Sequence, residues 1–133
     1  MTQLQCIVVT PEATVLDAAA DFVALPLFDG EIGIAPAHTP LIGRLGCGEM
    51  RIRQGDQTQC FYVDGGFVEV LGNVVSVLTG RAVPAASLDD RVALEQLITA
   101  RARSAHTPEE MAIRDRAETQ ARAQMRVARR AHE

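Results

Sequence analysis

The chain has 133 residues, 47% of them hydrophobic, and a net charge of −4, so it has room for one core or a small pair of cores. The negative charge argues against nonspecific nucleic-acid binding, although the 13 basic residues are all arginine. No segment approaches the roughly 20 apolar residues of a membrane span, and no basic signal region precedes the first apolar run. We therefore expect a soluble protein that is not exported and does not insert into a membrane.

Residues 1–84 alternate apolar and polar side chains in short runs, which is the period of a half-buried strand. Turns containing glycine separate several runs, at residues 55–56, 65–66 and 72–73. The pattern predicts antiparallel hairpins with strands over residues 4–9, 14–19, 22–27, 49–54, 59–63, 67–71 and 74–78. Two amphipathic sheets can share one core, so we expect an all-β N-terminal sandwich.

Residues 29–43 interrupt the strand pattern with glycines and prolines. Glycine permits positive φ, whereas proline fixes φ and removes a donor, so this segment is predicted to be a shaped loop. Glu31 is interpreted as a solvated turn acid near its tip. His38 is expected to form a loop hydrogen bond rather than to act as a catalyst, because the sequence offers it no evident partner.

Few residues suggest chemistry of their own. Cys6, Cys47 and Cys60 have apolar or strand-like neighbours and lack metal-ligand spacing, so we expect three reduced core thiols, no disulfide and no metal site. The sequence has no Walker, CxxC or HExxH motif. Asp64 is predicted to cap the turn that follows it, and Glu69 to point outward from a strand.

Charge and period both change near residues 82–86. Residues 1–84 carry four arginines against nine acids, whereas residues 85–133 carry nine arginines against eight acids. The second part has a helical period, with Ser87 as the expected N-cap of a helix over residues 88–103. Thr107, Pro108 and Glu110 are typical of the start of a second helix, over residues 108–131. We therefore expect a second domain, residues 85–133, in which an α-helical hairpin forms an antiparallel two-helix domain.

The second helix carries an inner stripe of mostly small side chains at roughly four-residue steps. A buried methylene-sized group contributes only about 0.8 kcal/mol, whereas ordering a residue costs about 1 kcal/mol or more. The hairpin is therefore predicted to be weakly docked, which suits a movable element, although an ordinary terminal helix of low stability has the same pattern. The stripe consists of Ile113, Ala117, Ala121, Met125 and Ala128.

A second stripe on the same helix is rich in arginine. Its charges repel one another at four-residue spacing unless an anion lies between them. It is either a solvated face, a contact for acidic residues of a partner, or a contact for nucleotide phosphates. Its members are Arg114, Glu118, Arg122, Arg126 and Arg130.

Two blocks of sequence resemble the epsilon subunit of the F-type ATP synthase. They are Gly-Glu-Ile-Gly-Ile-Ala-Pro-Ala-His-Thr-Pro-Leu at residues 30–41 and Gly-Gly-Phe-Val-Glu-Val at residues 65–70. A two-helix C-terminus follows, as it does in that family, so the resemblance covers nearly the whole chain. Where the family usually has Pro-Gly-His, this chain has Pro36, Ala37 and His38. Alanine does not freely adopt a left-handed conformation, so this departure bears on the local shape of the loop.

The resemblance implies a β-sandwich with a helical hairpin, in a subunit without a catalytic site of its own. It implies that this central-stalk subunit couples the gamma shaft to the ring of c subunits in ATP synthesis and ion transport. Glu31 would then meet the polar loops of the ring and His38 the shaft. The helices would regulate ATP hydrolysis and reach the alpha and beta subunits when they extend, with Arg122 and Arg126 as partner contacts. The location implied is peripheral, at the cytoplasmic face of the cell membrane.

Bacterial members of that family bind ATP between the sandwich and the folded helices, through (Ile/Leu)-Asp-x-x-Arg-Ala and two arginines four residues apart. The Leu-Asp pair ending at Asp89 matches, as do Arg122 and Arg126. Arg91 falls one residue early, however, and Val92 stands where the motif has arginine. A shift of one residue turns a helical side chain by about 100°. We therefore expect no required cofactor and only weak regulatory ATP binding at these residues.

Two other classes of function stay open on the residues alone. One is a free-standing β-sandwich ligand-binding module with a helical tail. The other, which has less support, is a small hydrolase that uses His38 with Asp64 or Glu31. Copurification with ATPase subunits would distinguish an adapter from a free module.

Overall fold

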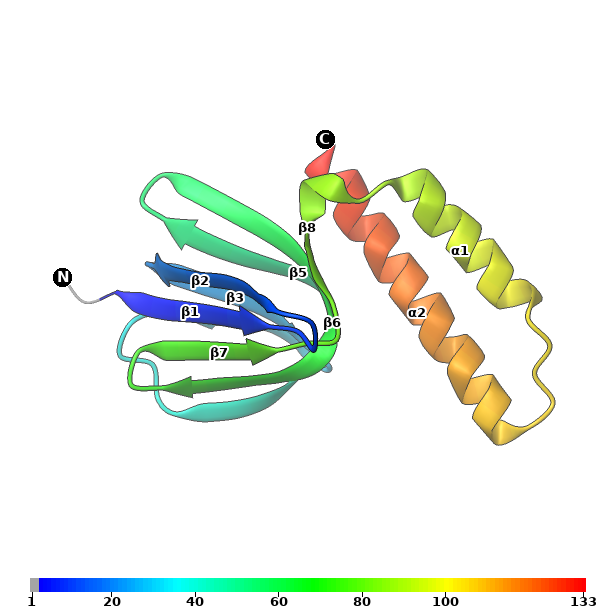
Figure 1. Ribbon diagram of the computed structural model, residues 1–133, viewed down its shortest axis with the longest axis horizontal. Helices are drawn as coiled ribbons and strands as arrows, with labels where there is room; N and C mark the ends of the chain where they lie inside the picture. The colour runs from blue at the N-terminus through cyan, green and yellow to red at the C-terminus, as the bar shows by residue number, and fades with distance from the viewer. Residues whose placement is uncertain (1–2) are drawn as a thin grey trace. The chain divides into compact units, whose positions relative to one another are not determined.

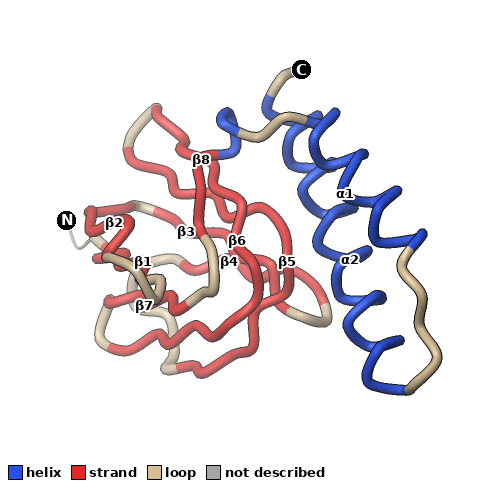
Figure 2. The backbone as a smooth tube through the Cα atoms, turned by 45° about the vertical axis from the view of Figure 1, so that its right-hand side comes forward, coloured by secondary structure: helices blue, strands red, loops and turns tan. Residues whose placement is uncertain are grey.

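The structure is a computed structural model that describes residues 3–133 of the chain. It divides into two compact units, one ending at Pro84 and the other spanning Ala85–Glu133. The first unit consists of strands and the second of helices (Figures 1 and 2). The predicted class, a β-sandwich followed by a two-helix segment, is confirmed. Among the described residues, no helix is both long enough and apolar enough to cross a membrane.

The first unit is built from eight strands in one continuous hydrogen-bonded sheet. Neighbouring strands follow the order β2-β1-β7-β6-β5-β3-β4, and β8 pairs with another part of β6. The long hairpin of β5 and β6 keeps one register over residues 41–54. The strands are β1 (Leu4–Val9), β2 (Thr14–Ala20), β3 (Phe22–Leu27), β4 (Gly30–Ile34), β5 (Leu41–Gln54), β6 (Gln57–Leu71), β7 (Val74–Leu78) and β8 (Ala82–Pro84).

One hydrophobic core lies inside this sheet, which folds over on itself as a sandwich (Figure 1). Alternate residues of each strand enter the core, because successive side chains of a strand point to opposite faces. Fully burying one such side chain contributes about 1.5–3 kcal/mol, so this cluster dominates the stability of the unit. Its members include Leu4, Cys6, Val8, Val23, Leu25, Ile34, Met50, Val63, Val68, Val70, Val75 and Val77.

Several features of the sheet differ from the prediction. β5, expected over residues 49–54, already begins at Leu41, and the short strand β8 was not predicted. Residues 30–34, expected within a loop, form β4 and pair with β3. Gly65 and Gly66, expected as a hairpin turn, lie inside β6 with φ of 68° and 104°. A side chain at Gly66 would overlap the carbonyl oxygen of Leu78, so this glycine permits a close approach between strands. In addition, β1 and β7 pair in parallel, whereas only antiparallel hairpins were expected.

The loop before β5 has an unusual backbone. Ala37 has a φ of 65°, in the left-handed region, although a non-glycine residue enters it at a cost of roughly 1–2 kcal/mol. Its backbone N–H donates to Oδ1 of Asn73 at 2.7 Å. Asn73 lies in the turn between β6 and β7. The alanine therefore takes the conformation that glycine would take freely, and a hydrogen bond from a distant turn accompanies it.

The second unit contains the 3₁₀ turn η1 (Ala85–Ser87) and two helices, α1 (Asp90–Ala102) and α2 (Pro108–Ala131). The helices lie side by side and antiparallel (Figure 2). Asp89, not the predicted Ser87, is the N-cap of α1, because Ser87 belongs to η1. Thr107 caps α2 as predicted, since its Oγ1 accepts from the Glu110 N–H at 3.1 Å.

The predicted inner stripe of α2 is correct only in part. Ala121 and Ala128 are buried, whereas the Ile113 side chain is 56% exposed. Each four-residue step turns a side chain by about 40°, so Ile113 points about 80° away from Ala121. Other buried positions of α2 lie between the predicted ones, at Ala123, Gln124 and Val127.

Candidate functional site

Large apolar side chains gather on the outer face of the sheet over β5, β6 and β7. Phe67 is 59% exposed, whereas its neighbour Val68 is buried, so Phe67 points away from the core. Phe67 pairs across the strands with Leu78, which is also more than half exposed. Ile42 lies on the same side, because it pairs with Glu69, two residues beyond Phe67. Glu69 lies on this outer side and is exposed, as predicted.

Phe28 adds to this surface at the end of β3. It is 66% exposed, and the Arg44 guanidinium lies 5.8 Å from the centre of its ring. Arg44 pairs with Phe67 across β5 and β6, which places Phe28 near the same group. We call Phe28, Ile42, Phe67 and Leu78 the apolar face. A hollow of about 360 Å³ beside Leu78 extends it and is lined by Val9, Thr10, Pro11, Thr79 and Gly80.

Sequence reasoning did not single out the apolar face. The apolar face could have been found from the residues of an alternating strand that point away from the core, because these positions are normally polar. In β6 that set contains Phe67 and Leu71 beside Glu69. Contiguous exposed apolar patches are uncommon on monomers and usually mark a contact with another molecule.

Glu31 is exposed, as predicted for a solvated acid, but it does not lie in a turn. It lies in β4 opposite Pro26, and its Oε1 is 2.7 Å from Nη2 of Arg51. Nη1 of Arg51 also lies 3.1 Å from Oε1 of Glu49, so one guanidinium joins two carboxylates. Hydrogen bonding to Glu31, and to Glu49 as a smaller contribution, raises the pKa of Arg51. The sequence did not predict this ion pair, because Arg51 lies on β5, 20 residues away from Glu31 in sequence.

His38 lies in the loop before β5. Its Nδ1 is 2.8 Å from the carbonyl oxygen of Thr39, a local hydrogen bond of the kind expected from the sequence. Asp64 instead accepts a hydrogen bond from the Cys47 thiol at 3.0 Å, and it does not end a hairpin. Glu31 is engaged by Arg51. His38, Asp64 and Glu31 thus contact different partners. Neither Asp64 nor Glu31 pairs with His38, as the hydrolase alternative would need.

The three cysteines differ in their surroundings. Cys6 is fully buried in the core, and burial, with a smaller contribution from the charge of Asp17, raises the pKa of its thiol to about 12. Cys47 and Cys60 are only partly buried, so the expectation of three core thiols is wrong for these two. All three are free of disulfides. In the part of the chain that the structure describes, no cluster of ligating side chains could hold a metal ion.

The arginine stripe of α2 lies largely in solvent. Nη2 of Arg122 is 3.6 Å from Oε2 of Glu118, an ion pair within one helical turn, and Arg126 is exposed. Asp89 is occupied as the N-cap of α1, where its Oδ1 accepts from the Arg91 N–H at 2.9 Å. A hollow of about 510 Å³ includes Asp89 in its lining but neither Arg122 nor Arg126.

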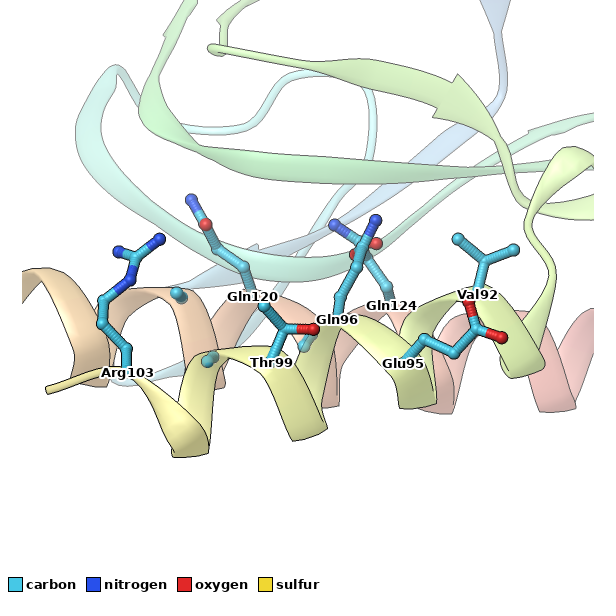
Figure 3. A pocket seen from close by; sticks show the side chains of 10 residues that line it. Val92, Glu95, Gln96, Thr99, Arg103, Gln120 and Gln124 are labelled. Carbon is cyan, nitrogen blue, oxygen red and sulfur yellow. The ribbon is translucent and has the colours of Figure 1, made fainter.

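A third hollow, of about 430 Å³, lies between α1 and α2 (Figure 3). Most of the side chains that line it are neutral, and its two charged groups, Glu95 and Arg103, have opposite sign. Val92, the residue in the arginine position of the ATP motif, belongs to the lining. The hollow therefore lacks the excess of positive charge that phosphate groups require. Its polar neutral residues are Gln96, Thr99, Gln120 and Gln124.

Comparison with known proteins gives a consistent family. The sequence model described as "ATP synthase, Delta/Epsilon chain, beta-sandwich domain" matches residues 3–85. A protein of Rhodopirellula baltica described as an ATP synthase epsilon chain is 48% identical over 126 residues, which is 95% of this chain and 98% of that protein. An epsilon chain of Rubrobacter xylanophilus is 34% identical over 81% of this chain and 74% of its own length.

Two solved structures share the fold. One comes from the Euglena gracilis mitochondrial ATP synthase, with OSCP, F1 and the c-ring, at a TM-score of 0.80 and 24% identity, covering 100% of this chain and 83% of that one. The other comes from the central stalk and c-ring of the Tetrahymena thermophila mitochondrial ATP synthase, at a TM-score of 0.75 and 13% identity, covering 96% and 97%. The sequence model matches the sandwich, and the Rhodopirellula baltica relative matches nearly the whole chain. The chain therefore belongs to the family of ATP synthase delta/epsilon chains, accessory subunits of that complex.

Proposed function

We propose that this chain couples the gamma shaft of ATP synthase to the ring of c subunits during ATP synthesis and ion transport. The observation that carries the proposal is the apolar face of the sheet. Covering exposed apolar area is worth about 25 cal/mol per Å², so a subunit that covers this face gains affinity from it. A folded-over sheet is also rigid enough to transmit torque between two partners.

The two partners are assigned to different residues of the sandwich, residues 1–84. The gamma shaft binds the apolar face together with the loop that carries His38. The polar loops of the c ring meet Glu31, whose carboxylate Arg51 holds at the exposed edge strand β4. In support, the related Tetrahymena structure is described as a central stalk with its c-ring.

Residues 85–133 form the regulatory part in this proposal. The helices restrain ATP hydrolysis when they extend to the alpha and beta subunits, and the exposed Arg122 and Arg126 contact acidic groups there. ATP itself binds weakly, because Val92 occupies the arginine position of the motif in the hollow between α1 and α2, where Glu95 offsets the charge of Arg103. The complex holds the chain peripherally, at the cytoplasmic face of the cell membrane.

The test is assembly with the rotor subunits. The double variant Ile42→Ser and Phe67→Ser removes the centre of the apolar face without touching the core. We expect it to fold normally but to lose capture by a complex of gamma and c ring, measured by pull-down with mass spectrometry.

Val15→Ser is a matched control, because Val15 is an exposed apolar residue on β2, outside the apolar face. It should leave capture unchanged. If the wild-type chain is not captured and migrates alone with a small ligand, the free-standing binding module is the better description.

A further inference from the structure

The His38 loop contains a conformation that its own sequence does not favour. The His38 N–H donates to the Ala35 carbonyl at 3.2 Å, which closes a four-residue turn. Pro36 is the second residue of this turn, and Ala37, with a φ of 65°, is the third. This is the pattern of a type II turn, whose third residue is normally glycine.

Asn73, which accepts the hydrogen bond from Ala37, is itself held in place by its surroundings. Gly72 and Asn73, with φ of 57° and 64°, form the tight turn between β6 and β7, in which both central residues have positive φ. The Asn73 carbonyl also accepts from the Gln5 N–H of β1 at 2.8 Å. Asparagine tolerates the left-handed region well, so Asn73 reaches its conformation at little cost. Ala37 and Asn73 are the two non-glycine residues with positive φ among residues 3–133.

We propose that Asn73 is a positioning residue for the His38 loop, which binds the shaft in the proposed function. Its side-chain carbonyl holds Ala37 in the left-handed conformation through the 2.7 Å hydrogen bond, and this fixes how the adjacent His38 is presented to the shaft. A conformation of this kind persists only where surrounding contacts determine it, and such residues cluster at functional sites. This inference rests on the proposed function, in which the loop binds the shaft.

The variant Asn73→Gly tests the role directly. Glycine keeps the left-handed turn but removes the Oδ1 acceptor, so β6 and β7 stay paired while Ala37 loses its support. One neutral hydrogen bond corresponds to about a two- to tenfold change in an equilibrium constant. We therefore expect affinity for a gamma and c-ring complex to fall by about two- to tenfold, and the native His38 ring signals in the NMR spectrum to shift.

A second substitution supplies the rescue. In the double variant Asn73→Gly with Ala37→Gly, the loop no longer needs the hydrogen bond, because glycine adopts the left-handed conformation freely. Affinity and the His38 signals should return to the wild-type values. Asn73→Asp keeps an acceptor oxygen and should bind like the wild type. If Asn73→Gly binds as tightly as the wild type, or if Ala37→Gly does not rescue it, the positioning role is wrong.

Hydrogen exchange at the Ala37 amide separates this inference from the proposed function. The amide should exchange faster in Asn73→Gly than in the wild type, whether or not a partner is present. Unchanged exchange would overturn the positioning role even if the rotor subunits bind. Faster exchange, with a wild-type chain that does not bind those subunits, would overturn the docking function and with it the role of Asn73 there.

Discussion

At the scale of single residues, the site depends on contacts between groups that are distant in sequence. Arg51 on β5 holds Glu31 on β4 across the intervening strand β3, and Asn73 holds Ala37 from a distant turn. Both contacts lie at the surface, where their contribution to folding is small and their effect on recognition can be large. Exposed ion pairs contribute about 0–1 kcal/mol, so the Glu31 pair fixes geometry more than it adds stability.

Replacing Glu31 by Gln, or His38 by Ala, should therefore leave the fold intact. We expect the free energy of unfolding to change by no more than about 0.5–1 kcal/mol, because both are surface positions. ATP-driven ion pumping by the reconstituted complex should fall in each case. Urea denaturation and a pumping assay measure the two effects. A variant that unfolds the sandwich, or two variants that pump normally, would contradict the docking role of these residues.

Cys6 predicts a dependence of stability on high pH. Its folded pKa, raised to about 12 by burial, lies above the ordinary thiol value of 9.0, so the folded state retains a proton that the unfolded state loses. Stability from this group is complete below pH 9 and decreases as the pH rises from 9 toward 12. Cys6→Ala should lessen that decrease in urea denaturation measured across this range.

In the native protein, a thiol reagent at pH 8 should modify Cys47 and Cys60 but not Cys6. Rapid modification of Cys6 would show that the core opens readily.

At the scale of elements, the helical hairpin combines good caps with a sparse apolar contact. Thr107 and Asp89 satisfy the helix starts, and buried alanines form much of the contact on α2. Small side chains allow close packing but remove little apolar area from water. This sparse contact supports the proposal that the hairpin is an element that can move.

The hollow between α1 and α2 makes a specific prediction about nucleotide. Val92→Arg places a guanidinium in its lining and should strengthen ATP binding by about ten- to a hundredfold, because a charge-assisted contact contributes roughly 1.5–3 kcal/mol. Calorimetric titration measures the affinity, and Arg91→Ala serves as the control that should leave it nearly unchanged. Tight, micromolar binding of ATP by the wild type would mean that another group already reaches the phosphates.

At the scale of the whole molecule, the chain divides into two compact units, and we propose docking for the first and regulation for the second. The sandwich has its own core, made entirely of residues before Pro84. Its strand pairings are also completed within that unit. A unit with a complete core and sheet is expected to fold by itself.

Deleting residues 85–133 should therefore leave a folded sandwich that assembles and couples, while ATP hydrolysis by the complex rises. Neutralising Arg122 and Arg126 together, as Arg→Gln, should produce part of that rise, because their attraction to acidic groups is lost. Circular dichroism of the truncated chain and the hydrolysis rate of the complex measure the outcome. If hydrolysis does not rise, or if the sandwich unfolds, the helices have a structural and not a regulatory role.

The sequence alone was enough to predict the class of fold, the start of α2 at Thr107 and most strand positions, because these depend on local period and on capping chemistry. The resemblance to the family was also carried by two contiguous blocks, residues 30–41 and 65–70. Only the tertiary structure decided that Gly66 lies within a strand, since that depends on the carbonyl of Leu78 across the sheet. The same holds for the Arg51 pair of Glu31, the apolar face and the left-handed Ala37. Each arises from strands and turns that meet only after folding, so no local pattern reports it.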